Sequence, residues 1–234
     1  MIPKVIHYCW FGRGKKPKLT QKCIASWIKH CPDYEVIEWN EDNFDVYENE
    51  YTKYCFENNK WAFLSDYVRL KVIYNNGGIY LDTDVEIVKP FDNLLEYDAF
   101  YGFENDKFVA SGLGFGAVKN HCTVKAMLDE YSKLWNNDNQ IVLTGCPTLN
   151  TNALLKLGLK LNGERQSICG AEVFSKEFFN PYDDPTGRLI RTDNTYSIHW
   201  YAKSALDKKS IFISKLTKPF HRVFGNDCFY FLKK

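Results

Sequence analysis

Short apolar runs alternate with longer amphipathic stretches along the first part of the chain. Residues 5–10 form an apolar, β-rich run that ends in a glycine-containing loop, which predicts a buried strand. Residues 19–30 show helical spacing, with Ile28 assigned to the apolar side, and residues 34–39 alternate as a strand does. Strand, helix and strand at this spacing are typical of the start of a parallel α/β sheet.

The clearest predicted helix covers residues 61–74, where apolar positions recur on one side and Gly77 and Gly78 provide the stop. A short strand is expected at 79–81, and another at 85–88. Further strands are predicted at 99–103, 113–118 and 196–200, and further helices at 121–135 and 147–157. We therefore expect an α/β fold with an open, mostly parallel mixed sheet flanked by helices.

The length of 234 residues suits one sizeable domain, which we place at residues 1–205, followed by a tail at 206–234. The formal net charge of +1 gives no global attraction to nucleic acid. The tail mixes basic, aromatic and aliphatic residues. Two interpretations of it stay open: a packed terminal helix with a solvated face, or an interfacial segment that contacts anionic lipid.

Eight cysteines are scattered without any C-x-x-C pair, and the residues after Met1 show no export signal. Free thiols in a reducing cytosol are therefore expected. No apolar run approaches the 18 residues that a membrane-spanning helix needs. These features predict a cytoplasmic location, peripheral to the inner face of the cell membrane if the tail contacts lipid.

Two carboxylates, Asp82 and Asp84, follow the short strand at 79–81. In the turn after a strand both can reach one hard cation, which prefers oxygen ligands. The helix just before that strand carries Ser65, Asp66 and Arg69, which share one face because they are three and four residues apart. A surface ion pair is the simpler interpretation of this face, whereas contact with a sugar and its phosphates is the functional one.

Two segments resemble one known family. Residues 63–85, FLSDYVRLKVIYNNGGIYLDTDV, resemble the DXD-motif region of glycosyltransferase family 32, and residues 2–12, IPKVIHYCWFG, resemble its N-terminal signature. The resemblance extends more loosely over about the first 200 residues. It implies a GT-A type, Rossmann-like nucleotide-sugar-binding domain.

The resemblance also implies roles for single residues around the donor. Trp10 matches an aromatic that stacks on the nucleotide base, and Tyr80 matches a tyrosine of the donor pocket. Asp66 and Arg69 match a pair that contacts the donor sugar, and Ser65 shares their helix face. Arg69 is expected to help stabilise the departing phosphate.

For the metal, the resemblance implies that Asp82 lies nearer the ribose and sugar and Asp84 nearer the ion. A late segment similar to one that closes the site in relatives adds His199 as a candidate ligand, since imidazole is competent for Mn²⁺. Lys203 and Ser204 of the same segment are candidates for a phosphate contact.

A glycine-rich stretch places Ala110, Ser111 and Gly112 on the acceptor side by the same resemblance. Its spacing differs from that of a dinucleotide-binding fingerprint. Cys146 interrupts a family Thr-Gly-Pro stretch and, without an identifiable His partner, is not expected to be a nucleophile.

We therefore expect a retaining, metal-dependent transferase that moves a hexose from a UDP-sugar to a glycan or lipid-linked glycan acceptor. The expected cofactor is Mn²⁺ or Mg²⁺, with Asp82, Asp84 and Arg69 as the catalytic set, and capsular or surface polysaccharide synthesis as the setting. Two alternatives are a phosphatase of the haloacid-dehalogenase type, which also has Asp-x-Asp after a strand, and a sugar-binding module without activity.

Overall fold

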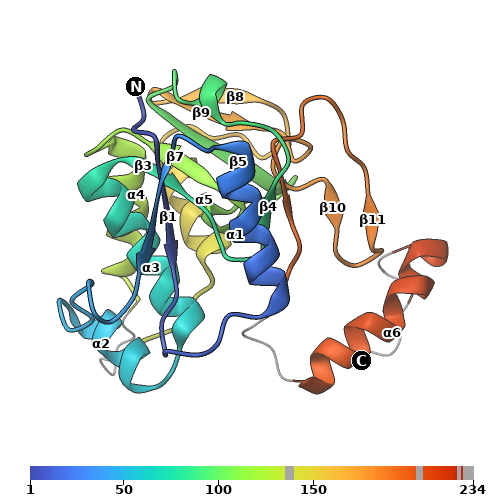
Figure 1. Ribbon diagram of the computed structural model, residues 1–234, viewed down its shortest axis with the longest axis horizontal. Helices are drawn as coiled ribbons and strands as arrows, with labels where there is room; N and C mark the ends of the chain where they lie inside the picture. Colours follow the sequence, from blue (N-terminus) through green and yellow to red (C-terminus); the bar gives the residue numbers. More distant parts are fainter. Residues whose placement is uncertain (135–139, 204–207, 226–227, 229–234) are drawn as a thin grey trace.

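A mixed eight-stranded sheet forms the centre of the computed structural model, which describes residues 1–134, 140–203, 208–225 and 228 (Figure 1). Along the sheet the order is β2 (Glu35–Trp39), β1 (Val5–Cys9), β3 (Gly78–Tyr80), β7 (Phe115–Ala117), β5 (Ala99–Asn105), β9 (Ala171–Phe174) and β8 (Gln166–Ile168), and β6 (Phe108–Val109) pairs with β5. Strands β2, β1, β3, β5 and β9 run in one direction, and β6, β7 and β8 run against them. The expected mostly parallel mixed α/β sheet is confirmed.

Helices cover both faces of this sheet. On one face α1 (Lys18–His30) packs its buried Cys23 and Trp27 against alternate residues of β1 and β3, whereas Ile28, which the periodicity assigns to the same side, is 58% exposed. The other face carries α2 (Glu50–Glu57), α3 (Trp61–Asn76), α4 (Cys122–Tyr131) and α5 (Cys146–Lys156). All three residues of β3 are buried, since helices cover both faces of the sheet.

Smaller elements complete the body. Strand β12 (Ser197–His199) pairs antiparallel with β4 (Val85–Ile87), and β10 (Tyr182–Asp183) pairs with β11 (Arg188–Leu189). Two short 3-10 helices are η1 (Asp92–Leu94) and η2 (Ser111–Leu113).

The last described helix, α6 (Lys208–Phe224), lies at the side of the body, below the β10–β11 hairpin in Figure 1. The expected domain boundary after residue 205 falls at 204–207, outside the described residues. None of the helices in the described ranges is long and apolar enough to cross a membrane.

Candidate functional site

The DXD carboxylates leave the sheet at the carboxyl end of β3. Gly77 and Gly78 turn the chain out of α3 with φ values of 71° and 101°, and a Cβ on Gly78 would lie 2.8 Å from Nε2 of His7. The pairing of β3 with β1 extends one residue further, because the amide of Leu81 donates to the carbonyl of His7 at 3.1 Å. Asp82 therefore directly follows the end of the strand, at the carboxyl-end edge of the sheet, where α/β proteins bind ligands.

Arg69 holds Asp82 from the side of α3. One guanidinium nitrogen, Nη2, lies 2.9 Å from Oδ1 of Asp82 and 2.9 Å from Oδ1 of Asp66. The hydroxyl of Tyr80 donates to the same Asp82 oxygen at 3.1 Å, and the Arg69 guanidinium lies 4.9 Å from the centre of the Tyr80 ring. The Asp82 carboxylate is thus fixed by two donors.

Burial sets the protonation behaviour of this group. Burial raises the pKa of Asp66 to about 6, against the opposing effect of Arg69. Burial likewise raises the pKa of Asp82 above its usual value, although Arg69 acts against the rise. The pKa of Arg69 lies well above its usual value, because its carboxylate neighbours, Asp82 first, outweigh the effect of burial. Arg69 therefore stays a cation that balances both carboxylates.

The side chain of Arg69 is only 4% exposed, and all the contacts described for it are with protein groups, so its role at the departing phosphate stays a prediction. Its Nε also donates to the carbonyl of Ser65 at 3.2 Å, and Nη1 lies 3.5 Å from the sulfur of Cys146. Because the guanidinium is enclosed and engaged with two carboxylates, it acts in this geometry on the position of Asp82. The hydroxyl of Ser65 is also engaged, since it donates to the carbonyl of Trp61 at 2.9 Å.

Asp84 is held by the late segment of the chain. The pairing of β12 with β4 sets His199 opposite Val85, which brings Nε2 of His199 to 3.2 Å from Oδ1 of Asp84. The other Asp84 oxygen accepts a hydrogen bond of 2.7 Å from the amide of Ala202. Tyr201 and Lys203, on either side of Ala202, have φ values of 51° and 56°, which L-residues adopt rarely and which often mark functional turns.

At both Asp84 and His199, these contacts act against the effect of burial on the pKa. Burial acts to raise the pKa of Asp84, but His199 and the Ala202 amide outweigh it, so that this pKa lies below the usual value. Burial acts to lower the pKa of His199, yet Asp84 outweighs it and the pKa is raised. Without a metal the pair is therefore stabilised in its charged form, and a cation bound by His199 would take the place of the imidazolium proton.

Asp82, Asp84 and His199 form a candidate metal centre, because one ligand atom from each lies within 4.8 Å of the others. Nδ1 of His199 is buried and has no hydrogen-bond partner among the residues that the structure describes. Two carboxylate oxygens and an imidazole nitrogen form a donor set that suits Mn²⁺, and the oxygens alone suit Mg²⁺. The residues present fit the expected cation.

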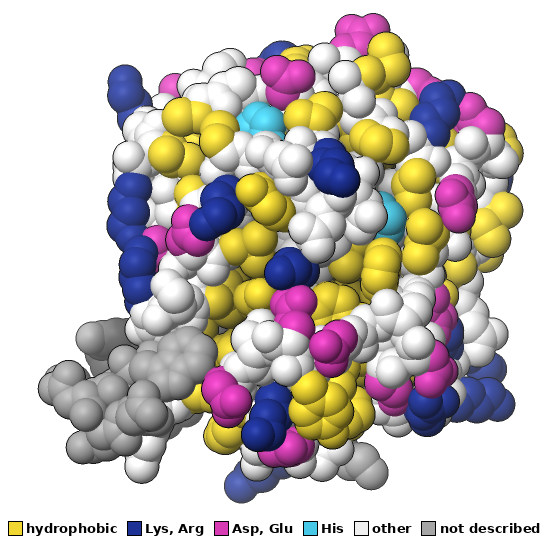
Figure 2. All heavy atoms as spheres, turned by 90° about the vertical axis from the view of Figure 1, so that its left-hand side faces the viewer, with side chains coloured by type: hydrophobic (Ala, Val, Ile, Leu, Met, Phe, Trp, Pro, Cys, Tyr) yellow, Lys and Arg dark blue, Asp and Glu magenta, His cyan; other side chains and the backbone are white. Residues whose placement is uncertain are grey.

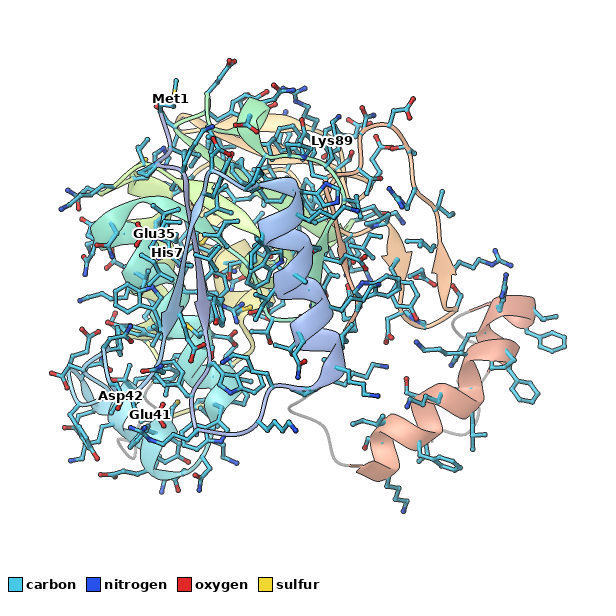
Figure 3. The ribbon with its side chains drawn as sticks, in the orientation of Figure 1. Met1, His7, Glu35, Glu41, Asp42 and Lys89 are labelled. Atoms are coloured by element: carbon cyan, nitrogen blue, oxygen red, sulfur yellow. The ribbon has the colours of Figure 1, made fainter. Side chains whose placement is uncertain are left out.

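Trp10 lies at the same sheet edge, just after β1. It lines a hollow of about 210 Å³ together with residues after β2, including Glu41 and Asp42, which are labelled in Figure 3. Its indole nitrogen donates to the carbonyl of Gly14 at 2.7 Å, and the ammonium of Lys16 lies 5.5 Å from its ring. This position is compatible with base stacking, which stays a prediction.

The three residues expected on the acceptor side are all buried. The hydroxyl of Ser111 accepts a hydrogen bond from Asn150 at 2.9 Å, and Ala110 is 4% exposed. Gly112 lies against the DXD motif, since a Cβ at this position would meet Oδ2 of Asp82 at 2.4 Å and Nη1 of Arg69 at 3.2 Å. In this structure Gly112 therefore makes room for the Asp82 carboxylate.

The side chain of Lys203 contacts the β10–β11 hairpin and α6. Its ammonium pairs with Asp184 at 2.6 Å and donates to the hydroxyl of Ser214 in α6. Its expected phosphate contact stays a prediction, and Ser204 lies outside the described residues. Cys146 is buried, and burial raises its pKa well above the usual value, which agrees with a non-nucleophilic residue.

The amide of Ala202 is the site group that sequence reasoning missed. It belongs to the backbone, so no side-chain motif marks it. The one sequence signal for it is its position three residues after His199, in the late segment that resembles the closing segment of related enzymes.

Known proteins that are similar to this chain share the DXD motif at which the candidate metal centre lies. Residues 17–101 match the family model described as glycosyltransferase sugar-binding region containing DXD motif. Inositol phosphoceramide mannosyltransferase 3 of Schizosaccharomyces pombe is 28% identical over 128 residues, covering 51% of this chain and 34% of that protein. Mannosyl phosphorylinositol ceramide synthase SUR1 of Saccharomyces cerevisiae is 28% identical over 142 residues, covering 58% and 37%.

A Legionella pneumophila protein, subversion of eukaryotic traffic protein A, is 26% identical over 129 residues, covering 44% of this chain and 20% of that protein. Among solved structures, the PaToxG glycosyltransferase superposes with a TM-score of 0.52 at 21% identity, over 66% of this chain and 69% of that one, which supports the GT-A type fold. The chain spans between a third and two fifths of the length of the fungal mannosyltransferases. Residues 17–101 are therefore similar to the DXD-containing sugar-binding region of glycosyltransferases, and the fold of the chain is similar to that of a solved glycosyltransferase.

Proposed function

We propose that this protein transfers a hexose from a nucleoside-diphosphate sugar to a glycan or lipid-linked acceptor, with a divalent cation at Asp82, Asp84 and His199. The observation that carries the proposal is the convergence of these three ligand atoms within 4.8 Å at the carboxyl end of β3. The side chain of Asp82 is 26% exposed, so the cluster is reachable from solvent on that side. Mn²⁺ is the first candidate ion, and Mg²⁺ is the second.

A cation bound there would supply positive charge to the diphosphate as it leaves. Both carboxylates are held in position by the protein before an ion binds. Arg69 and Tyr80 fix Asp82, while the Ala202 amide fixes Asp84, so neither side chain needs to reorganise when donor binds. This preorganisation supports a catalytic role over simple sugar binding.

We propose UDP as the nucleotide, on the strength of the family resemblance. The hexose is open between glucose, galactose and mannose, and mannose is favoured because the fungal relatives are named mannosyltransferases or mannosyl synthases. The same names describe an inositol phosphoceramide acceptor, which supports a lipid-linked acceptor here. A role in capsular or surface polysaccharide synthesis is the setting that the resemblance suggests.

We propose retention of configuration by front-face attack, in which the leaving phosphate accepts the proton of the acceptor hydroxyl. A double displacement would need a free carboxylate beneath the anomeric carbon. Asp66, which Arg69 links to Asp82, is only 13% exposed and ion-paired, so it is poorly placed to be that nucleophile. Nuclear magnetic resonance of the product linkage tests this step, and an inverted linkage would exclude it.

A donor screen tests the function itself. The protein would be incubated with Mn²⁺ and the UDP- and GDP-linked forms of glucose, galactose and mannose, and nucleotide release would be measured. We expect slow release from one donor and none from the others. Release of phosphate from simple esters without sugar transfer would favour the phosphatase alternative. Sugar binding with no turnover of any donor would favour the non-catalytic module.

A further inference from the structure

One side of α6 exposes large apolar side chains. Phe212 is 62% exposed, Leu216 is 55% exposed and Val223 is 72% exposed. These residues lie at positions i, i+4 and i+11 of the helix, so they share one face. Aromatic side chains of α6 project away from the rest of the molecule in Figure 3.

This concentration is local. Fifteen large hydrophobic residues are exposed in the described parts of the chain, and six of them belong to the 17 residues of α6. Two more, Leu189 and Ile190, follow Arg188, whose guanidinium donates to the carbonyl of Arg222 in α6 at 2.7 Å. On the face that Figure 2 shows, which lies across the molecule from α6, acidic and basic side chains are interspersed between small hydrophobic areas.

The charge of α6 has one sign. Its sequence contains no Asp or Glu, and its basic residues are Lys208, Lys209, Lys215, Lys218 and Arg222. Lys218 is turned to the body, where it pairs with Asp184 at 2.9 Å. Lys209, Lys215 and Arg222 are exposed. Large apolar side chains with exposed cations on the same helix are typical of a helix that lies in the plane of a membrane surface.

We propose that α6, together with Leu189 and Ile190 at the end of β11, docks this protein on an anionic lipid bilayer. The apolar side chains would enter the boundary between headgroups and acyl chains, and the exposed cations would contact anionic headgroups. A second copy of the chain is a poorer occupant. Two α6 faces brought together around a two-fold axis would juxtapose their cations without any carboxylate of either helix to balance them.

The docking surface is connected to the metal centre. A hollow of about 260 Å³ separates α6 from residues 200–203 and is lined by Ala202, Lys203 and Ser214 among others. Asp184 forms ion pairs with both Lys203 and Lys218. The segment that supplies His199 and the Ala202 amide is therefore linked to α6 through this carboxylate. A docked helix would therefore hold the metal centre close to lipid-linked molecules in the same bilayer.

Vesicle co-sedimentation of the complete chain tests the proposal. We expect binding to phosphatidylcholine vesicles that contain 30% phosphatidylglycerol, and weak binding to pure phosphatidylcholine. The triple variant Phe212→Gln, Leu216→Gln, Val223→Gln should lose at least about tenfold in partition coefficient. The matched control Ile28→Gln, Val142→Gln, Leu161→Gln removes exposed apolar side chains elsewhere and should bind as the original protein does.

Charge is tested separately. Each of Lys209→Gln and Lys215→Gln should weaken binding by roughly fivefold, because a basic residue near an anionic surface contributes about 1 kcal/mol. Amide hydrogen exchange of the unmutated protein should show slower exchange in residues 208–224 when vesicles are added.

Three results would overturn the proposal. The first is no sedimentation of the original chain, and the second is equal sedimentation of the triple variant and the control. The third is a concentration-dependent dimer that the triple variant abolishes, since a second copy would then occupy the face. None of these readouts uses sugar transfer, so they are independent of the proposed activity.

Discussion

Replacing Gly112 with alanine separates the geometry of the metal centre from the stability of the fold. The new Cβ would lie 2.4 Å from Oδ2 of Asp82, whereas a carbon and an oxygen are normally at least about 3.3 Å apart. The carboxylate must therefore retreat by roughly 0.9 Å. Gly112 lies in a buried 3-10 helix, and its φ is outside the left-handed region that would strain alanine, so the side chain of Asp82 is the part that yields.

A displacement of about 1 Å at a catalytic group can cost on the order of 100-fold in rate. We expect kcat/KM for nucleotide release to fall by about that factor, with weaker Mn²⁺ binding. The free energy of unfolding should change by only about 1 kcal/mol, because alanine restricts the unfolded chain while the displaced carboxylate weakens its contacts.

The control is Gly145→Ala, where the new Cβ makes an ordinary contact of 3.7 Å with Pro147. Steady-state kinetics and urea unfolding of both variants complete the test. Unchanged kcat/KM in Gly112→Ala would refute the reasoning, and so would a loss of activity that is explained by unfolding.

Three further predictions concern single residues. Arg69→Met should lower the free energy of unfolding by about 2–3 kcal/mol at pH 7, because the partly buried carboxylates of Asp66 and Asp82 would lose the cation that they share, and urea titration measures it. His199→Ala should weaken Mn²⁺ binding by about 10-fold to 100-fold in a calorimetric titration, and an unchanged affinity would remove His199 from the ligand set. Burial lowers the pKa of His7 to about 4, so the unfolded chain binds more protons between pH 6.5 and 4. Stability should therefore fall by up to about 3 kcal/mol as the pH drops through that window, and His7→Gln should lose this component of the pH dependence.

The His7 prediction depends on a neutral ring. Nδ1 accepts a hydrogen bond from the indole of Trp39 at 3.1 Å, so Nε2 carries the proton and donates to the carbonyl of Gly77 at 3.1 Å. In Figure 3 His7 lies on β1 beside the neighbouring strand. Protonation of the ring would remove the acceptor for Trp39 in a buried place.

The sequence predicted helices and strands well where a hydrophobic periodicity extended over many residues or where glycines marked the end of a helix. The helix expected at 61–74 is α3, Trp61–Asn76. Its end was predictable because Gly77 and Gly78 have positive φ values, which glycine adopts readily. Strands buried on both faces, such as β1 and β3, were visible as apolar runs.

The elements that were missed have weaker local signals. Helix α2 is capped by Asn49, whose side chain accepts a hydrogen bond from the amide of Thr52, but its eight residues are too few for a convincing period. The β8–β9 hairpin turns through Cys169 and Gly170 with φ values of 46° and 79°. Cysteine at the first of these positions is not a recognised hairpin residue, so the turn was not predicted.

Long-range contacts explain what sequence reasoning could and could not place in the site. Asp82 and Asp84 follow from one local motif, but His199 reaches Asp84 only because β12 pairs with β4 across more than a hundred residues. The family resemblance suggested that contact, and no local pattern could have done so. The ion pair of Lys203 with Asp184 was not predicted, because Asp184 belongs to a hairpin that the sequence did not reveal, and the phosphate contact of Lys203 stays a prediction.

Metal dependence of nucleotide release tests the central claim most directly. With the donor found in the screen, release would be followed in Mn²⁺, in excess EDTA, and after Mn²⁺ is restored, for the original chain and for Asp82→Asn, Asp84→Asn and Asp129→Asn. Asp129 pairs with Lys125 on the surface of α4 and serves as the control. We predict that EDTA abolishes release reversibly, that the two site variants lose it by at least about 100-fold, and that Asp129→Asn keeps it. Undiminished release in EDTA, or in either site variant, would contradict the account.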